Sequence, residues 1–219
     1  LRGARADDLS FEQGRIVHAD GRCVTFAQLL AAAERPVLEA QTVRVPPGQN
    51  EQALNRVMRG LTSQVGPEYP DFVAFSYAAH FAQVQVEPDT RRIRVMRQVA
   101  VLDCGTVLSP TTARSQAYGG LVWGIGAALR EASEVDPRYG GFVNNDLAEY
   151  VVPVHADIGE LVVEFVDQPD TRINPLGAKG LGEVVCVGAA AAIANAVYHA
   201  TGRRIRHLPI RVDDLFAQG

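Results

Sequence analysis

The sequence has few cysteines and no excess of basic residues, and each absence excludes a class of protein. Its three cysteines, Cys23, Cys104 and Cys186, are widely spaced and form no Cys-x-x-Cys pair, so we expect buried free thiols rather than a zinc or iron–sulfur site. Lys and Arg number 21 against 25 Asp and Glu, with no arginine cluster. We therefore expect no binding of nucleic acid.

Signals for a membrane protein, a metal centre built from side chains, or a hydrolase are also missing. No apolar run reaches the roughly 20 residues of a membrane-spanning helix, and the first 15 residues lack the apolar middle of a signal peptide. We expect a soluble chain without membrane contact and without a readable targeting signal. No Gly-x-Ser-x-Gly motif occurs. No protein metal ligands are expected, because metal-ligand spacing is absent among the histidines, which are His18, His80, His155, His199 and His207.

The size and composition are those of a globular protein. The chain has 219 residues, of which 47% are apolar, enough for one domain or two packed subdomains. We place the subdomains at about residues 1–70 and 71–219. The opening residues, LRGARADDLSFEQGR, lack an initiator methionine and resemble the middle of a fold, so we expect a fragment.

The first 70 residues contain one hairpin signal and two helix signals. Asp20-Gly21 separates two short apolar runs, which predicts a hairpin. Thr25 is the expected N-cap of the helix that follows. Residues 51–65 have the period of an amphipathic helix, and its apolar face is expected to join the core through Leu54, Val57, Met58 and Leu61.

From residue 72 the pattern becomes that of strands. Ala82, Val84 and Val86 alternate with polar residues up to a turn at Pro88-Asp89, which predicts a strand on one side of a hairpin. The return strand is expected to carry Ile93, Val95, Val99 and Val101. A further strand is expected at residues 160–166. Because strands and helices come in groups rather than in regular alternation, the predicted fold class is α+β, with an antiparallel or mixed sheet and packed helices.

Two helices are expected to pack against this sheet. Ser109 is the predicted N-cap and Pro110 the first residue of a helix that continues to about residue 132. Four glycines lie within it, and each costs up to about 1 kcal/mol relative to alanine, so we expect another segment to approach it closely. The second helix covers residues 189–202 and ends at Gly202 as a left-handed cap.

The loop GAKGLGE, residues 177–183, is the first candidate site. It lacks the spacing of a phosphate-binding P-loop. Gly180 and Gly182 allow backbone amides to approach an anionic ligand before a helix begins. Glu183, flanked by valines, is expected to be desolvated, with a raised pKa that suits a general base. A plain structural turn with a solvent-exposed glutamate explains the loop equally well.

The second candidate site is the loop after the return strand. Its amides and the hydroxyls of Thr106, Ser109, Thr111 and Thr112 could hold a diphosphate or an extended polar cofactor. Gln116 could recognise an oxo group or a pterin edge, although a core-satisfied amide is as good an explanation. The stretch GIGAAL inside the expected helix lacks the third glycine and the preceding strand of a dinucleotide fingerprint.

These motifs together resemble a known family. The succession FAQVQVEPDTRRIRVMRQVAVLDCGTVLSP, ARSQAYGGLVWGIGAAL, GAKGLGE and AIANAVYHATGRRIRHLPI is similar to the C-terminal part of the molybdenum-binding large subunit of the xanthine dehydrogenase and aldehyde oxidase family, closest to its bacterial aldehyde-oxidising members. The resemblance covers nearly the whole chain. It implies a fragment of the molybdenum cofactor-binding domain.

The resemblance also assigns roles to residues. It implies that Glu183 is the general base beside the molybdenum and that Gln116 lies near the metal. The loop Thr106–Thr112 would hold the dinucleotide part of the cofactor, through Thr106, Val107, Leu108, Ser109, Pro110, Thr111 and Thr112. The pterin would contact Lys179, Gly180, Leu181 and Gly182. Val184 and Ser115 stand where the family usually has proline and glycine, which affects backbone shape more than chemistry.

The implied cofactor is a molybdenum–molybdopterin cytosine dinucleotide, with oxygen supplied by water and an aldehyde or N-heterocycle as substrate. Implied partners are the upstream part of the same subunit and companion subunits or domains with iron–sulfur centres and FAD. Export with a partner to the periplasm is an alternative to the cytoplasm. The fragment alone is expected to be inactive and without cofactor, and a noncatalytic cofactor-binding or assembly domain is the alternative function.

Overall fold

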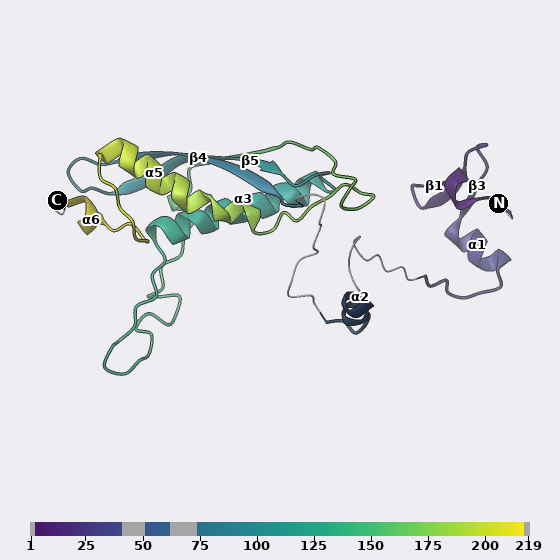
Figure 1. Ribbon diagram of the computed structural model, residues 1–219, viewed down its shortest axis with the longest axis horizontal. Helices are drawn as coiled ribbons and strands as arrows, with labels where there is room; N and C mark the ends of the chain where they lie inside the picture. The colour runs from purple at the N-terminus through teal and green to yellow at the C-terminus, as the bar shows by residue number, and fades with distance from the viewer. Residues whose placement is uncertain (1–2, 41–50, 62–73, 217–219) are drawn as a thin grey trace. The chain divides into compact units, whose positions relative to one another are not determined.

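A computed structural model describes residues 3–40, 51–61 and 74–216 (Figure 1). The chain divides into two compact units, Leu1–Val45 and Pro46–Gly219. The division near residue 70 stays a prediction, because residues 62–73 lie outside the described residues.

The first unit is a small antiparallel sheet followed by a helix. A 3₁₀ turn, η1 (Ala6–Asp8), precedes strands β1 (Leu9–Glu12), β2 (Arg15–His18) and β3 (Cys23–Thr25), which pair in the order β1-β2-β3. The β2–β3 hairpin is confirmed, with Gly21 at φ 89° in its turn; β1 was not predicted. Thr25 caps α1 (Phe26–Ala32) through a reciprocal capping box with Gln28.

Helix α2 (Glu51–Met58) is shorter than predicted. Gly60 has φ 69° and ends the helical geometry, and residues 62–65 of the expected helix lie outside the described residues. Met58 and Leu61 are exposed, so the prediction that they join the core is wrong for this chain. The side chains of Leu54 and Val57 are not among those described.

A mixed three-stranded sheet is the centre of the second unit. Strand β4 (Tyr77–Val86) pairs antiparallel with β5 (Ile93–Asp103), and β5 pairs parallel with β6 (Glu160–Phe165). The predicted hairpin is confirmed, and its turn includes Pro88-Asp89. Along β4, Ala82, Val84 and Val86 are partly buried and the residues between them are exposed. The fold is α+β with a mixed sheet, as predicted.

Strand β5 carries Ile93, Val95, Val99 and Val101, as predicted, but a bulge changes the pattern of burial along it. Pairing moves from Gln83–Arg97 to Val84–Val95, so Met96 is an extra residue in β5, as in a β-bulge. The bulge reverses which residues face inward. Val95 is buried before it, but after it the buried residues are Gln98, Ala100 and Leu102, while the predicted Val99 and Val101 are only partly buried.

After β5, the described part of this unit also contains four helices and one 3₁₀ turn: α3 (Pro110–Leu129), η2 (His155–Asp157), α4 (Val184–Val187), α5 (Ala189–Thr201) and α6 (Val212–Phe216). Helices α3 and α5 run along the β4–β5 pair (Figure 1). Pro110 begins α3 as predicted, and Gly202 ends α5 with φ 71°. Ser109 occupies the N-cap position, but its side chain makes no capping hydrogen bond, which corrects that part of the prediction.

The glycines of α3 allow close helix packing, as predicted. A Cβ atom on Gly120 would lie 2.7 Å from the Cβ of Val185 in α4. A Cβ atom on Gly124 would overlap Ala189 at the start of α5. By contrast, no atom lies within 4 Å of where a Cβ on Gly119 would be. Helix α3 is therefore closely packed on one side and open on another.

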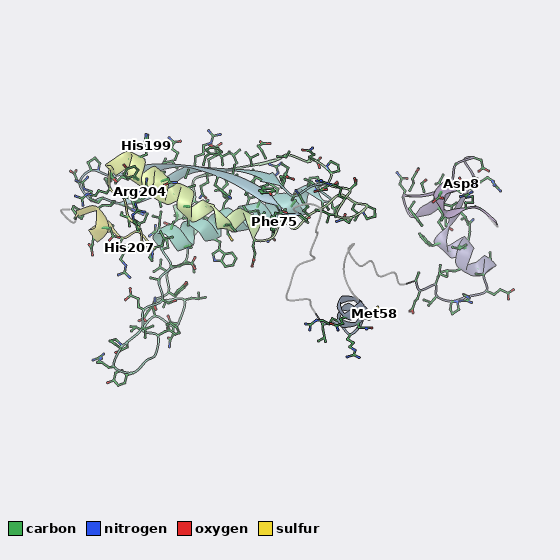
Figure 2. All side chains as sticks on the ribbon, in the orientation of Figure 1. Asp8, Met58, Phe75, His199, Arg204 and His207 are labelled. Atoms are coloured by element: carbon green, nitrogen blue, oxygen red, sulfur yellow. The ribbon has the colours of Figure 1, made fainter. Side chains whose placement is uncertain are left out.

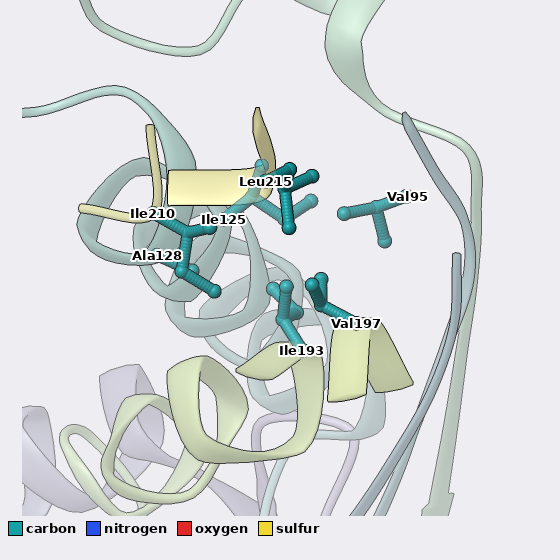
Figure 3. Close-up of a cluster of buried hydrophobic side chains, with 7 residues drawn as sticks. All are labelled: Val95, Ile125, Ala128, Ile193, Val197, Ile210 and Leu215. Atoms are coloured by element: carbon teal, nitrogen blue, oxygen red, sulfur yellow. The ribbon is translucent and has the colours of Figure 1, made fainter. Parts of the chain in front are cut away.

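Buried side chains form two clusters. The first cluster, drawn in Figure 3, consists of Val95, Ile125, Ala128, Ile193, Val197, Ile210 and Leu215. The second cluster consists of Ala100, Leu102, Ala117, Leu121, Val163, Val185 and Ala189. The cysteines are free, but only Cys104 is buried; Cys186 is partly buried and Cys23 exposed, so the expectation of three buried thiols is wrong.

The stretch Val184–Thr201 is, by length and composition, apolar enough to cross a membrane, which the sequence analysis overlooked. Length and composition are weak evidence, because the core helix of a globular protein has the same properties. The stretch is divided into α4 and α5 at Gly188, and Val185, Ile193 and Val197 are buried within this unit. We interpret it as core packing.

Candidate functional site

The loop after β5 and the glycine-rich loop before α4 are tied together by Asp103 and Lys179. The Lys179 ammonium donates to Asp103 Oδ2 at 3.0 Å, and the Gly105 N–H donates to Asp103 Oδ1 at 3.1 Å. Burial raises the pKa of Asp103, but these two hydrogen bonds and the lysine charge outweigh it and lower the pKa below the ordinary 3.8. Asp103 therefore orients the loop.

Backbone contacts hold the same two loops close. The Lys179 N–H donates to the Cys104 carbonyl at 2.7 Å, and the Thr106 N–H donates to the Gly177 carbonyl at 2.9 Å. Gly105 has φ 68°, and a Cβ atom there would overlap the Gly177 carbonyl. A glycine is required at this crossing for both conformation and space.

A pocket of about 340 Å³ lies between these loops. It gathers most of the residues that the sequence analysis assigned to the dinucleotide and two of those assigned to the pterin. Pro110 and Thr111 do not line it, and Thr111 is exposed on the first turn of α3. The lining residues are Cys104, Thr106, Val107, Leu108, Ser109, Thr112, Ala113, Gln116, Ala178, Lys179 and Leu181.

A larger cavity, of about 820 Å³, adjoins it and shares Gln116 and Thr112 with it. Gln116 and Glu183, predicted from segments 67 positions apart in the sequence, both line this cavity. The Gln116 amide donates to the Gly182 carbonyl at 3.4 Å. The large cavity is lined by Thr112, Ser115, Gln116, Gly119, Gly120, Val122, Trp123, Glu131, Val152, Pro153, Gly182 and Glu183.

Glu183 is the residue that precedes α4 and occupies its N-cap position. Its carbonyl accepts hydrogen bonds from the Cys186 N–H and the Cys186 thiol, both at 3.1 Å. The Glu183 side chain is exposed, and so is that of Gln116. The expected desolvation of Glu183 is therefore wrong for this chain, and an amide satisfied in the core, one of the two explanations weighed for Gln116, does not apply.

Several residues of the large cavity were not predicted from the sequence. Glu131 accepts a hydrogen bond from the Tyr150 hydroxyl at 3.0 Å, and this bond, together with burial, raises the pKa of Tyr150. Trp123, Val152 and Pro153 add an apolar wall. The sequence feature that could have indicated Glu131 is Gly126, because its lack of a side chain leaves room for the Glu131 carboxylate.

The donor groups and open space of the two pockets fit an extended anionic group. Amides in the first turn of α3 have no intrahelical partner, and the Ser109 side chain does not cap them. Around Gly180 there is open space, and near Gly182 only the Gln116 amide comes within 4 Å of where a Cβ atom would lie. Backbone at both glycines can therefore approach a ligand closely.

A family model, described as the molybdopterin cofactor-binding domain, matches residues 1–159. The chain belongs to this family. The match includes the loop Thr106–Thr112 and Gln116, whereas Glu183 lies beyond it.

Similar proteins agree with this membership. The chain is 40% identical over 202 residues to the aldehyde oxidoreductase molybdenum-binding subunit PaoC of Escherichia coli O157:H7, covering 88% of this chain and 28% of that protein. It is 38% identical over 137 residues to the probable hypoxanthine oxidase XdhD of Escherichia coli K12, covering 63% of this chain and 14% of that protein.

A solved structure has the same fold. Quinoline 2-oxidoreductase from Pseudomonas putida 86 matches with a TM-score of 0.67 and 25% identity, over 97% of this chain and 26% of that one. The chain spans 28% of the length of PaoC, 14% of XdhD and 26% of quinoline 2-oxidoreductase.

Proposed function

We propose that this chain forms one wall of the molybdenum cofactor site in a hydroxylase that oxidises an aldehyde or an N-heterocycle. The observation that carries the proposal is the single cavity lined by Gln116, Gly182 and Glu183, next to the pocket between the 106–112 and 178–181 loops. Both compound classes occur among the similar proteins, which include aldehyde oxidoreductases and quinoline 2-oxidoreductase.

The two pockets would divide the cofactor between them. Residues Thr106–Thr112 and the start of α3 would offer amides and hydroxyls to the diphosphate of a molybdopterin cytosine dinucleotide. Lys179–Gly182 and Gln116 would contact the pterin. The Lys179 ammonium is held by Asp103, so this residue contributes to the pterin site mainly by fixing the loop and its backbone. When bound, the cofactor supplies a redox centre that takes two electrons from the substrate.

Glu183 is the general base. Its carboxylate stands at the wall of the large cavity, where it can accept a proton while a water-derived oxygen is added to the substrate carbon. In this chain the side chain is exposed, so the low-dielectric surroundings of a working base must come from the remaining part of the subunit. Gln116 holds the backbone of Gly182 beside it.

The proposed partners are the upstream part of the large subunit and companion subunits or domains with iron–sulfur centres and FAD, which receive the electrons. The relative from Paenarthrobacter nicotinovorans is named as a subunit of a dehydrogenase complex. We place the enzyme in the cytoplasm, with export in company with a partner as the alternative. The 219 residues alone are inactive and without cofactor, because the opposite wall is missing.

The test uses the full-length subunit purified with its partners. We expect about one molybdenum and one releasable cytosine nucleotide for each large subunit, and oxidation of an aromatic aldehyde in ¹⁸O-labelled water should give acid that carries the label. Cofactor without any oxidation of aldehydes or N-heterocycles would favour the noncatalytic assembly domain. Absence of molybdenum from a complex with intact iron–sulfur centres would contradict the proposal.

A further inference from the structure

His80 lies on the inner face of β4, in register with Ala100 of β5. Both of its ring nitrogens are buried, and neither makes a hydrogen bond that meets normal geometry with the described residues. Burial lowers the pKa of His80, although the nearby Val184 carbonyl acts in the opposite direction. The lowered pKa favours the uncharged form of the ring. Its two unpaired nitrogens cost free energy that an apolar side chain at this position would not.

The ring contacts both ends of α4. The Val184 carbonyl, at its first residue, lies close enough to influence His80. At the other end, a Cβ atom on Gly188 would lie 2.5 Å from the His80 Cδ2 atom. Gly188 has φ −99°, an ordinary conformation, so the glycine is needed for the space that the ring occupies rather than for its backbone angles.

Helix α4 has only four residues, too few to be stable by itself. Its orientation is therefore set by its neighbours. On one side Gly120 of α3 approaches Val185 closely, and on the other side the His80 ring touches Gly188. Because Glu183 immediately precedes α4 and its carbonyl accepts the bonds from Cys186, the orientation of α4 determines where the Glu183 backbone lies.

We propose that His80 is a positioning residue for Glu183: its ring, held between β4 and the α4–α5 junction, fixes the short helix that sets the carboxylate at the cavity wall. This inference rests on the proposed function for its catalytic consequence. The contact itself, between a β4 side chain and the helix junction, is independent of it.

The test compares His80→Phe with His80→Gln in the full-length, molybdenum-loaded enzyme. Phenylalanine keeps a flat ring without nitrogens, while glutamine keeps a donor and an acceptor. Small displacements of a reacting group cost up to about 100-fold in rate. We expect His80→Phe to lower kcat per molybdenum by about tenfold or more, with KM within about twofold, and His80→Gln to recover part of the loss.

A second readout does not depend on catalysis. Hydrogen–deuterium exchange of the segment 183–188, followed by mass spectrometry, should be faster in His80→Phe than in the unaltered enzyme. His199→Phe is the matched control, because His199 is exposed and lines the same groove between β4 and α5. It lies near the C-terminal end of α5 (Figure 2), whereas α4 precedes the other end of that helix. His199→Phe should change neither kcat nor exchange.

Gly188→Ala tests the same contact from the helix side, and it should also lower kcat and speed exchange at 183–188. If His80→Phe cannot be loaded with molybdenum, Gly188→Ala takes its place in the test. Unchanged exchange at 183–188 together with kcat within twofold in these variants would overturn the proposal. If exchange rises while Glu183→Gln keeps full activity, His80 positions α4 as proposed and the base assignment of Glu183 is what fails.

Discussion

The two hydrophobic clusters of the second unit differ in what closes them. The first cluster contains bulky side chains from α3, α5 and β5 and is completed by Ile210 and by Leu215 of α6 (Figure 3). The second cluster has three alanines among its seven members and lies next to Gly120 and α4, beside the large cavity. The first cluster therefore contributes mainly to stability. In the second cluster, small side chains allow the helices to pack closely next to the large cavity.

The largest expected effect on stability comes from the first cluster. Ile193 is fully buried there, so Ile193→Ala should lower the free energy of unfolding by about 2–5 kcal/mol. The activity of each molybdenum-loaded molecule should stay unchanged. Thermal unfolding of the full-length subunit measures the loss of stability, and kcat per molybdenum measures the activity. Leu147→Ala, at an exposed position, should change stability by less than about 0.5 kcal/mol.

A buried charge at the site comes next. Lys179 is 8% exposed and pairs with Asp103, which is 31% exposed. Lys179→Met leaves the carboxylate without its partner and should cost about 2 kcal/mol, less than for a fully buried pair because Asp103 keeps contact with water. Arg97→Met, which breaks an exposed pair with Glu160, should cost less than about 1 kcal/mol. Equal losses of thermal stability in Lys179→Met and Arg97→Met would contradict the conclusion that the Lys179–Asp103 pair holds the loop.

Acidification should sharpen the same test. The pKa of Asp103 is lowered in the folded protein, so its stabilising contribution is complete above the unfolded value of 3.8 and is lost as the pH falls through the folded value. The difference in free energy of unfolding between the unaltered protein and Lys179→Met should therefore be constant near neutral pH and should shrink as the pH falls below about 4. Urea unfolding across this range measures it.

A matched pair of glycines in α3 should give stability effects of opposite sign. Gly124→Ala should destabilise by about 1–3 kcal/mol, because its Cβ atom would overlap Ala189 and force the helices apart. Gly119→Ala has open space and should stabilise by up to about 1 kcal/mol, since alanine favours the helix. Opposite shifts of the thermal midpoint are expected. Shifts in the same direction would show that α3 is not packed on one side and open on the other.

Much of the fold followed from local sequence patterns. The alternation in β4, the turn at Pro88-Asp89, Pro110 at the start of α3 and the Gly202 cap all depend on neighbouring residues, and each was found where predicted. The bulge at Met96 was missed because only pairing with β4 reveals the extra residue. A residue pattern alone does not define register.

Sequence motifs singled out two residues that line the large cavity, but not how exposed they are. Motifs identified Gln116 and Glu183, and the structure brings them to one cavity. The exposure of Glu183 was mispredicted, because burial depends on which segments cover a loop, and flanking valines do not determine that. Glu131 and Val152 were missed because nothing local to their sequence connects them with Glu183.

The most direct test of the central claim is the Glu183→Gln substitution in the complete, molybdenum-loaded enzyme, with Glu164→Gln, an exposed carboxylate of β6, as control. The substitution keeps size and hydrogen bonding but removes the base. We predict a loss of about 10²–10⁴-fold in kcat, unchanged molybdenum content, and no effect of Glu164→Gln. Turnover of Glu183→Gln within about threefold of the unaltered enzyme, a difference of only about 0.65 kcal/mol, would contradict the assignment of Glu183 as the base.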